Sequence, residues 1–582
     1  MPCPGRILTE RADPIVSPGS VSGHVHTISG GNGFGFEMDY EQARTSTCSS
    51  CPIKQDLSNY WTPALYYQYQ NGSFENVPQV GDSVGSYGGM TVYYLQRPGP
   101  NNDALKAFPE GFRMLAGDPF KRNRTDDFES DAVSFVCLDY SSTSPQTHGF
   151  PTGNCPDGIR AQIFFPSCWD GVNLDSSDHK SHVSYPASGS NDNGPCPASH
   201  PVHLVSLFYE VIYDTSNFAD KWYGSGQPFV FAMGDATGYG MHGDFVNGWD
   251  VDALQTAVDT CNNDSGLLSD CPVFEYFTNA ESKACVVPPS IDEAVTGVLD
   301  KLPGCNPVTD GPEEAAILSC DNPPIGAYKE YFTDVTSSLG YGYVGCGSDG
   351  TTRTLSAASE SGSDMDVETC VSFCSDKGYA YAGMEYASQC YCGDSVPSDK
   401  APVEHIVGNC FSPCAGNSSE YCGGSNALSL YKKCDGGSCT NALYTPPYGS
   451  ASSSSSDTSS SSSGNSTSTS SSVSSASSAS SVSSASSSAA SSSTVASSTS
   501  ASSSSSAPAS STTSATATSA SSSSSTSSSA TATSTAKAKH RKQKQGWTAR
   551  QRSRFAAARA AHEIAEREAD EVEATLAEAM NA

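Results

Sequence analysis

Short runs of apolar and aromatic residues, separated by turn-forming stretches, dominate the first half of the chain. Runs of this kind include MTVYYLQ, AVSFVCLDY, RAQIFFPSCW and HPVHLVSLFYEVIYD. Their length, their β-branched and aromatic residues and the Gly, Pro, Asn and Asp between them predict β-strands. We therefore predict that residues 1–310 form a mainly β domain, a large β-sandwich or jelly-roll-like fold with a few helices.

Helical periodicity is confined to a few short segments. In the large domain it covers residues 250–260 and 290–302. In the string MDVETCVSFC, Val367, Val371 and Cys374 share the spacing of one helix face. We predict a helix in each segment.

The C-terminal quarter has a different composition. Residues 450–535 are almost pure Ser, Thr and Ala, which leaves nothing to bury and predicts a disordered, O-glycosylated, low-complexity stalk. Residues 536–582 contain a basic block followed by an Ala/Glu-rich sequence, which predicts a helical tail. We interpret residues 311–340 as a connector before a second domain at 341–432.

Cysteine spacing points to disulfide bonds. The chain has 22 cysteines. An even set in a segment too short to bury a large core predicts a four-bridge framework and an oxidising compartment, whereas CxxxC and CxC spacings do not match a zinc site. Twelve further cysteines lie from Cys3 to Cys320, and Cys434 and Cys439 could form another bridge. The eight clustered cysteines are Cys346, Cys370, Cys374, Cys390, Cys392, Cys410, Cys414 and Cys422.

The residues around the eight cysteines are similar to a known domain. The strings YVGCGSDG, MDVETCVSFC, GYAYAGMEYASQCYCGD and CFSPCAGNSSEYCGGSNALSLY resemble the WSC (cell-wall stress component) domain over 341–432, except that Ala387 replaces a usual Gly. The resemblance implies a small, disulfide-rich α+β fold similar to PAN/apple modules. It also implies binding of fungal polysaccharide, with β-glucan as the expected partner.

Four tyrosines near the centre of this segment are candidate sugar-binding residues. A tyrosine offers a sugar ring an apolar face together with a hydroxyl group. The alternative is that some of these rings belong to the core. The candidates are Tyr379, Tyr381, Tyr386 and Tyr391.

The N-terminal region also resembles a known family. The strings RADPIVSPGSVSGHVHTISGGNGF, QIFFPSCWDGVNLDSSDHKSHVSYP and GDATGYGMHGDFVNGWD are similar to the secreted fungal and bacterial domain-of-unknown-function family number nineteen ninety-six. This resemblance implies no particular activity. In that family residues precede the position of Met1, so we expect an incomplete gene model that lacks a signal peptide.

Charge and cysteine content indicate the compartment. The formal net charge of −31 argues against a nucleic-acid partner. The sequence contains no apolar stretch of the ~20 residues that a membrane span needs. The cysteines and five Asn-x-Ser/Thr sequons favour an extracellular or cell-wall glycoprotein, and the oligomeric state is left open.

Histidines and carboxylates of the large domain are the candidate catalytic residues. Carboxylates could supply acid, base or nucleophile, and a histidine could act as the base of a lyase. Trp169 and Trp249 could stack on a sugar. If the domain is an enzyme, we expect a glycoside hydrolase or polysaccharide lyase. The candidates are Asp175, Asp178, His179, His182, His242 and Asp244.

Two other interpretations of these residues stay open. His24 and His26 share one face if they lie on a strand, and with His179, His182 or His242 they could bind a divalent metal, although no recognised motif requires a cofactor. Alternatively, the histidines and aspartates only cross-link loops by hydrogen bonds.

The combined pattern gives two functional hypotheses. The first is a secreted fungal cell-wall-associated protein that binds polysaccharide through its WSC domain and possesses an N-terminal domain that cleaves polysaccharide. The alternative is a non-catalytic cell-wall structural, adhesion or glycan-binding protein.

Overall fold

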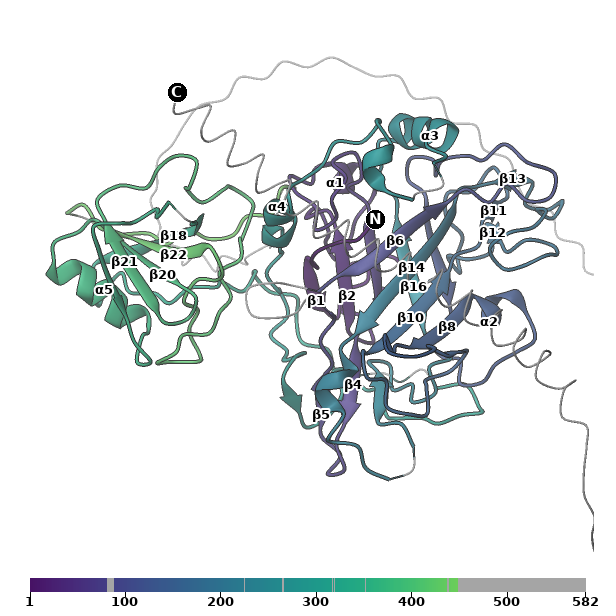
Figure 1. The fold of residues 1–582 in the computed structure, drawn as a ribbon, viewed down its shortest axis with the longest axis horizontal. Helices are drawn as coiled ribbons and strands as arrows, with labels where there is room; N and C mark the ends of the chain where they lie inside the picture. Colours follow the sequence, from purple (N-terminus) through teal and green to yellow (C-terminus); the bar gives the residue numbers. More distant parts are fainter. Residues whose placement is uncertain are drawn as a thin grey trace, which may run out of the picture. The chain divides into compact units, whose positions relative to one another are not determined.

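The computed structural model describes residues 1–80, 88–224, 226–263, 266–316, 318, 320–350, 352–436 and 439–448 (Figure 1). The predicted stalk at 450–535 and tail at 536–582 lie outside these residues. The described helices are α1 (Tyr40–Arg44), α2 (Phe128–Ala132), α3 (Val251–Thr260), α4 (Asn279–Ala284) and α5 (Val367–Asp376), with 3₁₀ turns at Thr215–Phe218 and Leu268–Asp270.

Antiparallel strands dominate the described residues, which confirms the prediction of a mainly β protein. The strands are β1 (Leu8–Glu10), β2 (His26–Gly30), β3 (Asn59–Pro63), β4 (Leu65–Gln68), β5 (Phe74–Asn76), β6 (Met90–Leu95), β7 (Arg113–Gly117), β8 (Val133–Cys137), β9 (Gln146–Thr147), β10 (Ile159–Phe164), β11 (Cys168–Trp169), β12 (Val183–Ser184), β13 (Val202–His203), β14 (Ser206–Tyr213), β15 (Phe229–Phe231), β16 (His242–Val246), β17 (Val298–Leu299), β18 (Tyr341–Ser348), β19 (Ala358–Ser361), β20 (Tyr381–Glu385), β21 (Gln389–Gly393) and β22 (Ala427–Lys433).

Two five-stranded sheets form a sandwich in the N-terminal domain. Their strand orders are β1-β2-β3-β16-β7 and β6-β14-β10-β8-β9. The facing sides meet in one apolar core, where the Tyr60 ring of β3 packs edge-on against the Tyr209 ring of β14, with 5.8 Å between ring centroids. Smaller sheets, β12-β11-β13 and β15-β4-β5-β17, extend this domain.

The other face of the first sheet holds three of the candidate polar residues. The register pairs His26 with Pro63 and Asp244 with Trp61, so His242 is level with Pro63. Because side chains alternate along a strand, His26, His242 and Asp244 project from the same face, whereas Tyr60 and Phe245 project into the sandwich core. The N-terminal domain thus builds a polar region on the back of its sandwich.

One of the two helices predicted in the large domain is confirmed. Helix α3 begins after Asp250, whose side chain accepts a hydrogen bond from Ala253 N, as expected of an N-cap. The prediction of a helix at 290–302 is wrong, because this segment is irregular apart from β17. The backbone N–H groups of Ser290 and Ile291 donate to the Glu10 carboxylate, so a distant side chain binds the backbone of this segment.

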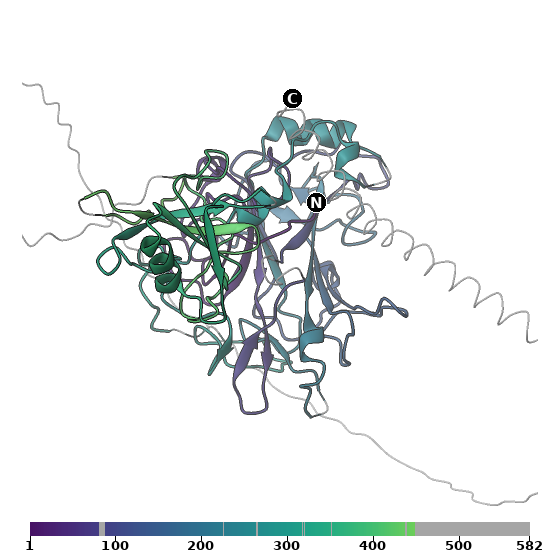
Figure 2. The ribbon, with the colours of Figure 1, turned by 60° about the vertical axis from the view of Figure 1, so that its left-hand side comes forward.

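The C-terminal described region is a small α+β unit, as predicted. Its sheet has the order β18-β22-β20-β21-β19, and α5 packs on one face of β20 and β21 (Figure 2). Asp366 caps α5 by accepting from Thr369 N. In the β20–β21 turn, Ala387 has a φ of 67°, a left-handed conformation that glycine adopts without steric cost. This conformation explains why glycine suits this position.

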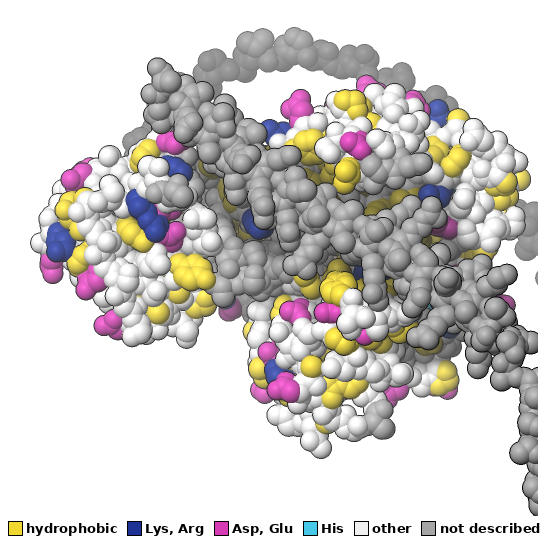
Figure 3. All heavy atoms as spheres, in the orientation of Figure 1, with side chains coloured by type: hydrophobic (Ala, Val, Ile, Leu, Met, Phe, Trp, Pro, Cys, Tyr) yellow, Lys and Arg dark blue, Asp and Glu magenta, His cyan; other side chains and the backbone are white. Residues whose placement is uncertain are grey.

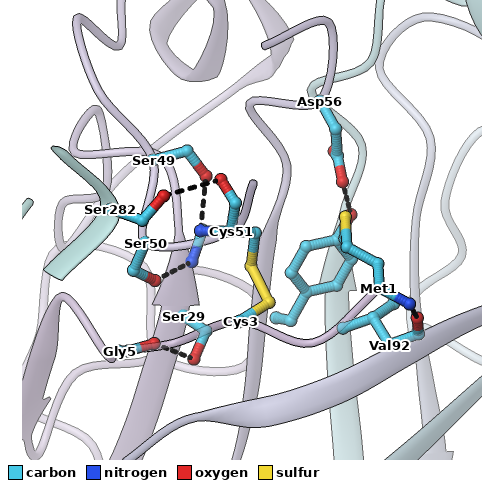
Figure 4. The surroundings of a disulfide bond; sticks show 12 residues. Met1, Cys3, Gly5, Ser29, Ser49, Ser50, Cys51, Asp56, Val92 and Ser282 are labelled. Carbon is cyan, nitrogen blue, oxygen red and sulfur yellow. Dashed lines mark hydrogen bonds between the residues drawn. A yellow bond between two sulfur atoms is a disulfide. The ribbon is translucent and has the colours of Figure 1, made fainter. Parts of the chain in front are cut away.

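Every described cysteine is in a disulfide, so the four-bridge prediction and the predicted Cys434–Cys439 bridge are both confirmed. Figure 4 shows one of the bridges of the large domain, between Cys3 and Cys51, with Ser49 and Ser282 hydrogen-bonded around Cys51. The others there are Cys48–Cys285, Cys137–Cys155, Cys168–Cys196, Cys261–Cys271 and Cys305–Cys320. The four in the small domain are Cys346–Cys410, Cys370–Cys390, Cys374–Cys392 and Cys414–Cys422.

The face drawn in Figure 3 mixes hydrophobic, acidic and basic side chains. Within the described part of the chain, we find no helix with the length and apolar character that crossing a bilayer would demand.

Candidate functional site

Three histidines far apart in the sequence converge on the back of the sandwich. The Nε2 atom of His242 lies 3.0 Å from Nε2 of His24 and 3.4 Å from Nε2 of His26. The ring centroids are 4.4 to 5.6 Å apart, and the rings meet edge to face. The fold therefore unites the predicted metal candidates His24 and His26 with the predicted catalytic candidate His242.

Backbone carbonyls fix two of these rings. His26 Nδ1 lies 3.1 Å from the carbonyl oxygen of Ala12, and His242 Nδ1 lies 2.9 Å from that of Gly240. A carbonyl only accepts, so Nδ1 carries the proton in both neutral rings and Nε2 presents a lone pair. Both lone pairs point into the cluster.

The cluster favours neutral imidazoles. Burial lowers the pKa of His26 to about 4. Burial, and then the neighbouring His26, lower the pKa of His242 to about 4. Burial, and then the two other rings, lower the pKa of His24 well below its usual value. The three rings are thus uncharged at neutral pH.

Two buried carboxyl groups belong to the same region. Burial, and then the nearby Asp13, raise the pKa of Asp244 well above its usual value, and Asp244 Oδ2 has no hydrogen-bond partner among the described residues. Burial also raises the pKa of Asp13, although Ile15 N, Val16 N and the neighbouring His242 partly oppose this effect. At least one of these carboxyl groups is therefore suited to hold a proton near neutral pH.

The Asp175–His182 loop runs beside β7 at the edge of this face. Leu115 N donates to the carbonyl oxygen of His179. The His179 ring bonds the Asp175 carboxylate through Nδ1 at 2.8 Å, and Arg113 Nε lies 3.8 Å from that carboxylate. The DSSD segment is a loop, and it places a His–Asp pair at the margin of the histidine cluster's face.

His182 and Asp178 serve this loop differently. The two ring nitrogens of His182 contact Ser176 Oγ and the Arg113 carbonyl oxygen, both at 2.9 Å. Asp178 accepts from Ser181 N and from the Ser176 hydroxyl, and these bonds hold its pKa far below the usual range. Both residues therefore cross-link the loop, and nothing in their contacts points to a substrate.

The two candidate tryptophans occupy different environments. Trp249 is 1% exposed in the sandwich core, where its indole N–H donates to Tyr94 Oη at 2.7 Å. The structure therefore corrects the expectation that Trp249 stacks on a sugar, because it has no exposed face. Trp169 is partly exposed, and its indole N–H donates to the Asn173 carbonyl oxygen.

In the small domain the four candidate tyrosines differ in exposure. Tyr386 is 46% exposed on the β20–β21 turn. Tyr381 and Tyr391 are half-buried on the sheet face opposite α5, where the Arg353 guanidinium lies 4.5 Å from the Tyr391 ring centroid. Tyr379 is half-buried beside the core that α5 covers.

Sequence reasoning overlooked the residues that support the histidine cluster. Arg122 and Asp235 form a buried ion pair, with 3.6 Å between Nε and Oδ1. Asp235 Oδ2 accepts from Gly240 N, and the carbonyl oxygen of Gly240 faces the His242 ring. Asp235 belongs to the string GDATGYGMHGDFVNGWD, and Asp13 belongs to RADPIV. Both strings carry the family resemblance, but neither string indicates that these carboxyl groups lie beside the histidine cluster.

Comparisons with known proteins agree with both resemblances. Residues 13–249 match the family described as a domain of unknown function (DUF1996), and residues 343–424 match the WSC domain. Two WSC domain-containing proteins of Arthroderma benhamiae are 43% identical over 116 residues and 36% identical over 96 residues, or 19% and 16% of this chain. Human Kremen protein 2 is 34% identical over 125 residues, or 21% of this chain.

These matches cover 15%, 10% and 26% of the three relatives' own lengths, so they compare segments and not whole proteins. This chain carries a DUF1996 domain at residues 13–249 and a WSC domain at residues 343–424.

Proposed function

We propose that this protein is an extracellular, cell-wall-associated polysaccharide-binding protein, and that its WSC domain binds β-glucan. The WSC family supports the carbohydrate ligand. The complete pairing of the described cysteines supports an oxidising compartment. The N-terminal domain, in this proposal, acts on the polysaccharide that the WSC domain holds.

The observation that carries the binding proposal is the exposed ring of Tyr386. A tyrosine ring at the surface can stack on a sugar and also hydrogen-bond it. The backbone of the turn that holds Tyr386 is bound to residues 422–424, because Tyr386 N donates to the Gly424 carbonyl oxygen and Ala387 N to that of Cys422. Because the backbone of the turn is already ordered, binding has to order only the side chain of Tyr386, which lowers the entropic cost of binding.

The binding proposal is tested with the full chain on insoluble β-glucan. We expect Tyr386→Ala to weaken binding about tenfold, because one stacking contact contributes about 1–1.5 kcal/mol. The matched control is Tyr140→Ala, which removes a tyrosine that is 57% exposed in the N-terminal domain. Equal binding by the Tyr386 variant and the wild type would remove Tyr386 from the ligand surface. Failure of the wild type to bind any wall polysaccharide would overturn the proposal.

Asp244 carries the proposal that the N-terminal domain cleaves polysaccharide. A carboxyl group whose pKa is raised by burial is suited to act as a general acid, and because Asp244 is only 1% exposed, this proposal requires the residues that cover it to move before a substrate reaches it. We expect the wild type to release soluble oligosaccharides and Asp244→Asn to lower the rate at least ~100-fold. Asn preserves the shape of the protonated side chain, so the fold should persist. Mass spectrometry identifies the products, and a mass deficit of one water would mark a lyase.

A non-catalytic glycan-binding protein is the second candidate. The observation that favours it is that His182 and Asp178 use their polar atoms to cross-link a loop. Binding without product release across fungal and plant wall polysaccharides would select this candidate. Product release that Asp244→Asn leaves unchanged would keep an enzyme but reject Asp244 as its acid.

A further inference from the structure

We propose that His24, His26 and His242 together bind one divalent transition-metal ion, of the class that prefers imidazole ligands and for which Zn²⁺ is the probe. This inference does not rest on the proposed function, because it concerns the metal content of the N-terminal domain alone.

The first argument is the direction of the lone pairs. Carbonyl oxygens hold Nδ1 of His26 and Nδ1 of His242, which leaves both Nε2 atoms unprotonated in neutral rings. These two Nε2 atoms lie 3.4 Å apart, a separation at which two lone pairs repel. His24 can donate its own Nε2 proton to the lone pair of His242. The lone pair of His26 is then left without a donor, because His24 has only one proton on Nε2.

A cation at the centre would satisfy all three rings at once. Two imidazole nitrogens bound to one zinc ion at about 2.0–2.1 Å are about 3.3–3.4 Å apart at the tetrahedral angle. The observed Nε2 separations are 3.0 and 3.4 Å, and the ligand atoms of the three residues all lie within 4.8 Å of one another. Small shifts of the His24 ring would complete a three-histidine site.

The surrounding contacts resemble those that orient metal ligands. Histidine ligands usually donate their second ring N–H to a carbonyl or carboxylate, which fixes the ring. His26 and His242 make this contact with Ala12 and Gly240. Gly240 N in turn donates to Asp235, so a buried carboxylate holds the loop that supports His242.

Charge and access also agree with a metal. Arg11 and Arg122, two cationic side chains that act electrostatically on His24, are paired with Glu293 and Asp235 respectively. Asp13 lies close enough to His242 to interact electrostatically with it, so a carboxyl group borders the cluster. His24 is only half-buried, whereas His26 and His242 are buried, so the cluster comes closest to solvent at His24.

Other metal-ligand groups among the described residues are unsuitable. One contains Cys168, Cys196 and His203, and another contains Cys370, Cys374 and Cys390. Every one of these cysteines is in a disulfide and has no thiolate to offer. Of these three groups of described residues, the three-histidine cluster is therefore the one whose ligand atoms are all available to a metal ion.

The test measures metal content of the full chain without any polysaccharide. The purified chain is stripped with a chelator, incubated with Zn²⁺, separated from free ion and analysed by mass spectrometry of the metal, and Zn²⁺ affinity is measured by calorimetry. We expect one zinc ion per chain and affinity at least about 100-fold weaker in His26→Ala and in His242→Ala. His200→Ala, a histidine variant outside the cluster, should bind like the wild type.

A second variant guards against misfolding. His24 is half-buried, so His24→Gln should keep the wild-type circular dichroism spectrum and lose the zinc. Zinc should raise the Tm of the wild type and leave that of His24→Gln unchanged, because only a folded site gains stability from its ligand. A wild type without stoichiometric zinc, or a folded His24→Gln with unchanged affinity, would overturn the proposal. Since no polysaccharide is present, failure of the cleavage proposal would leave these measurements unaffected.

Discussion

At the scale of single residues, the histidines of the N-terminal domain divide by what their ring nitrogens contact. His182 uses both nitrogens in hydrogen bonds to Ser176 and Arg113. His24, His26 and His242 instead turn nitrogen atoms toward one another. These contacts make His182 a cross-link within its loop and make the other three histidines candidates for metal ligands. The residue type alone does not distinguish these two roles.

The cross-linking role of His182 predicts a stability effect. His182→Ala should lower the free energy of unfolding by about 1–3 kcal/mol, because the Arg113 carbonyl oxygen and the Ser176 hydroxyl lose a buried partner. Denaturant unfolding followed by tryptophan fluorescence measures the change. The control is His179→Ala, whose half-exposed ring should cost less than about 1 kcal/mol. Equal losses in the two variants would contradict the structural role of His182.

At the scale of elements, β1 ties an irregular segment to the first sheet. Glu10, the last residue of β1, is buried and accepts from Ser290 N at 2.8 Å and from Ile291 N at 2.6 Å. Its second oxygen, Oε2, has no hydrogen-bond partner among the described residues. Burial raises the pKa of Glu10 to about 7, an effect that these two backbone donors only partly oppose.

This raised pKa predicts a pH dependence of stability. The folded protein holds the Glu10 proton more tightly than the unfolded chain, so the stabilisation from the protonated form is complete below pH 4.5 and is lost as pH rises through about 7. Glu10→Gln keeps an acceptor for both backbone groups and cannot ionise. From pH 4.5 to 7 we expect the wild type to lose stability relative to this variant, by an amount on the order of 3 kcal/mol.

Parallel denaturation curves of the two proteins across this pH range measure the difference. Subtracting one protein from the other cancels groups common to both, including buried histidines whose lowered pKa values act in the opposite direction. A difference that stays constant from pH 4.5 to 7 would show that Glu10 ionises normally in the folded state.

At the scale of the whole molecule, disulfides constrain both domains. Cys48–Cys285 joins residues 237 positions apart, and such long loops lose the most unfolded-state entropy on closure. In the small domain, Cys370 and Cys374 link α5 to β21 through Cys390 and Cys392. Two domain families with different cores thus share one stabilising chemistry, and an oxidising environment suits both.

The presence of a DUF1996 domain and a WSC domain on one chain also supports the proposed function. A binding module on the same chain raises the local concentration of the polysaccharide near the N-terminal domain without any new contact there. This advantage would apply whether the N-terminal domain cleaves the polysaccharide or only binds it.

Local patterns in the sequence predicted several of the long strands and two of the helices. Runs such as AVSFVCLDY and HPVHLVSLFYEVIYD became β8 and β14, and the periodicities at 250–260 and in MDVETCVSFC became α3 and α5. The number and spacing of the cysteines also predicted four bridges in the small domain, but which cysteines pair is known only from the structure. These features depend on neighbours in the sequence, through side-chain alternation, helix periodicity and the small core of a short segment.

Only the tertiary structure shows which residues that are distant in the sequence come into contact. Strand register brings His26 and His242 to the same face, level with Pro63, and a spacing motif cannot reveal a partner 216 residues away. Segment 290–302 does not form the helix that its periodicity suggested, and its residues Val298 and Leu299 pair instead with β5, which is distant in the sequence. Burial decided that Trp249 is core and Tyr386 is surface. The sequence alone thus predicted several local elements and the two families, whereas the histidine site depends on long-range packing, which local patterns do not encode.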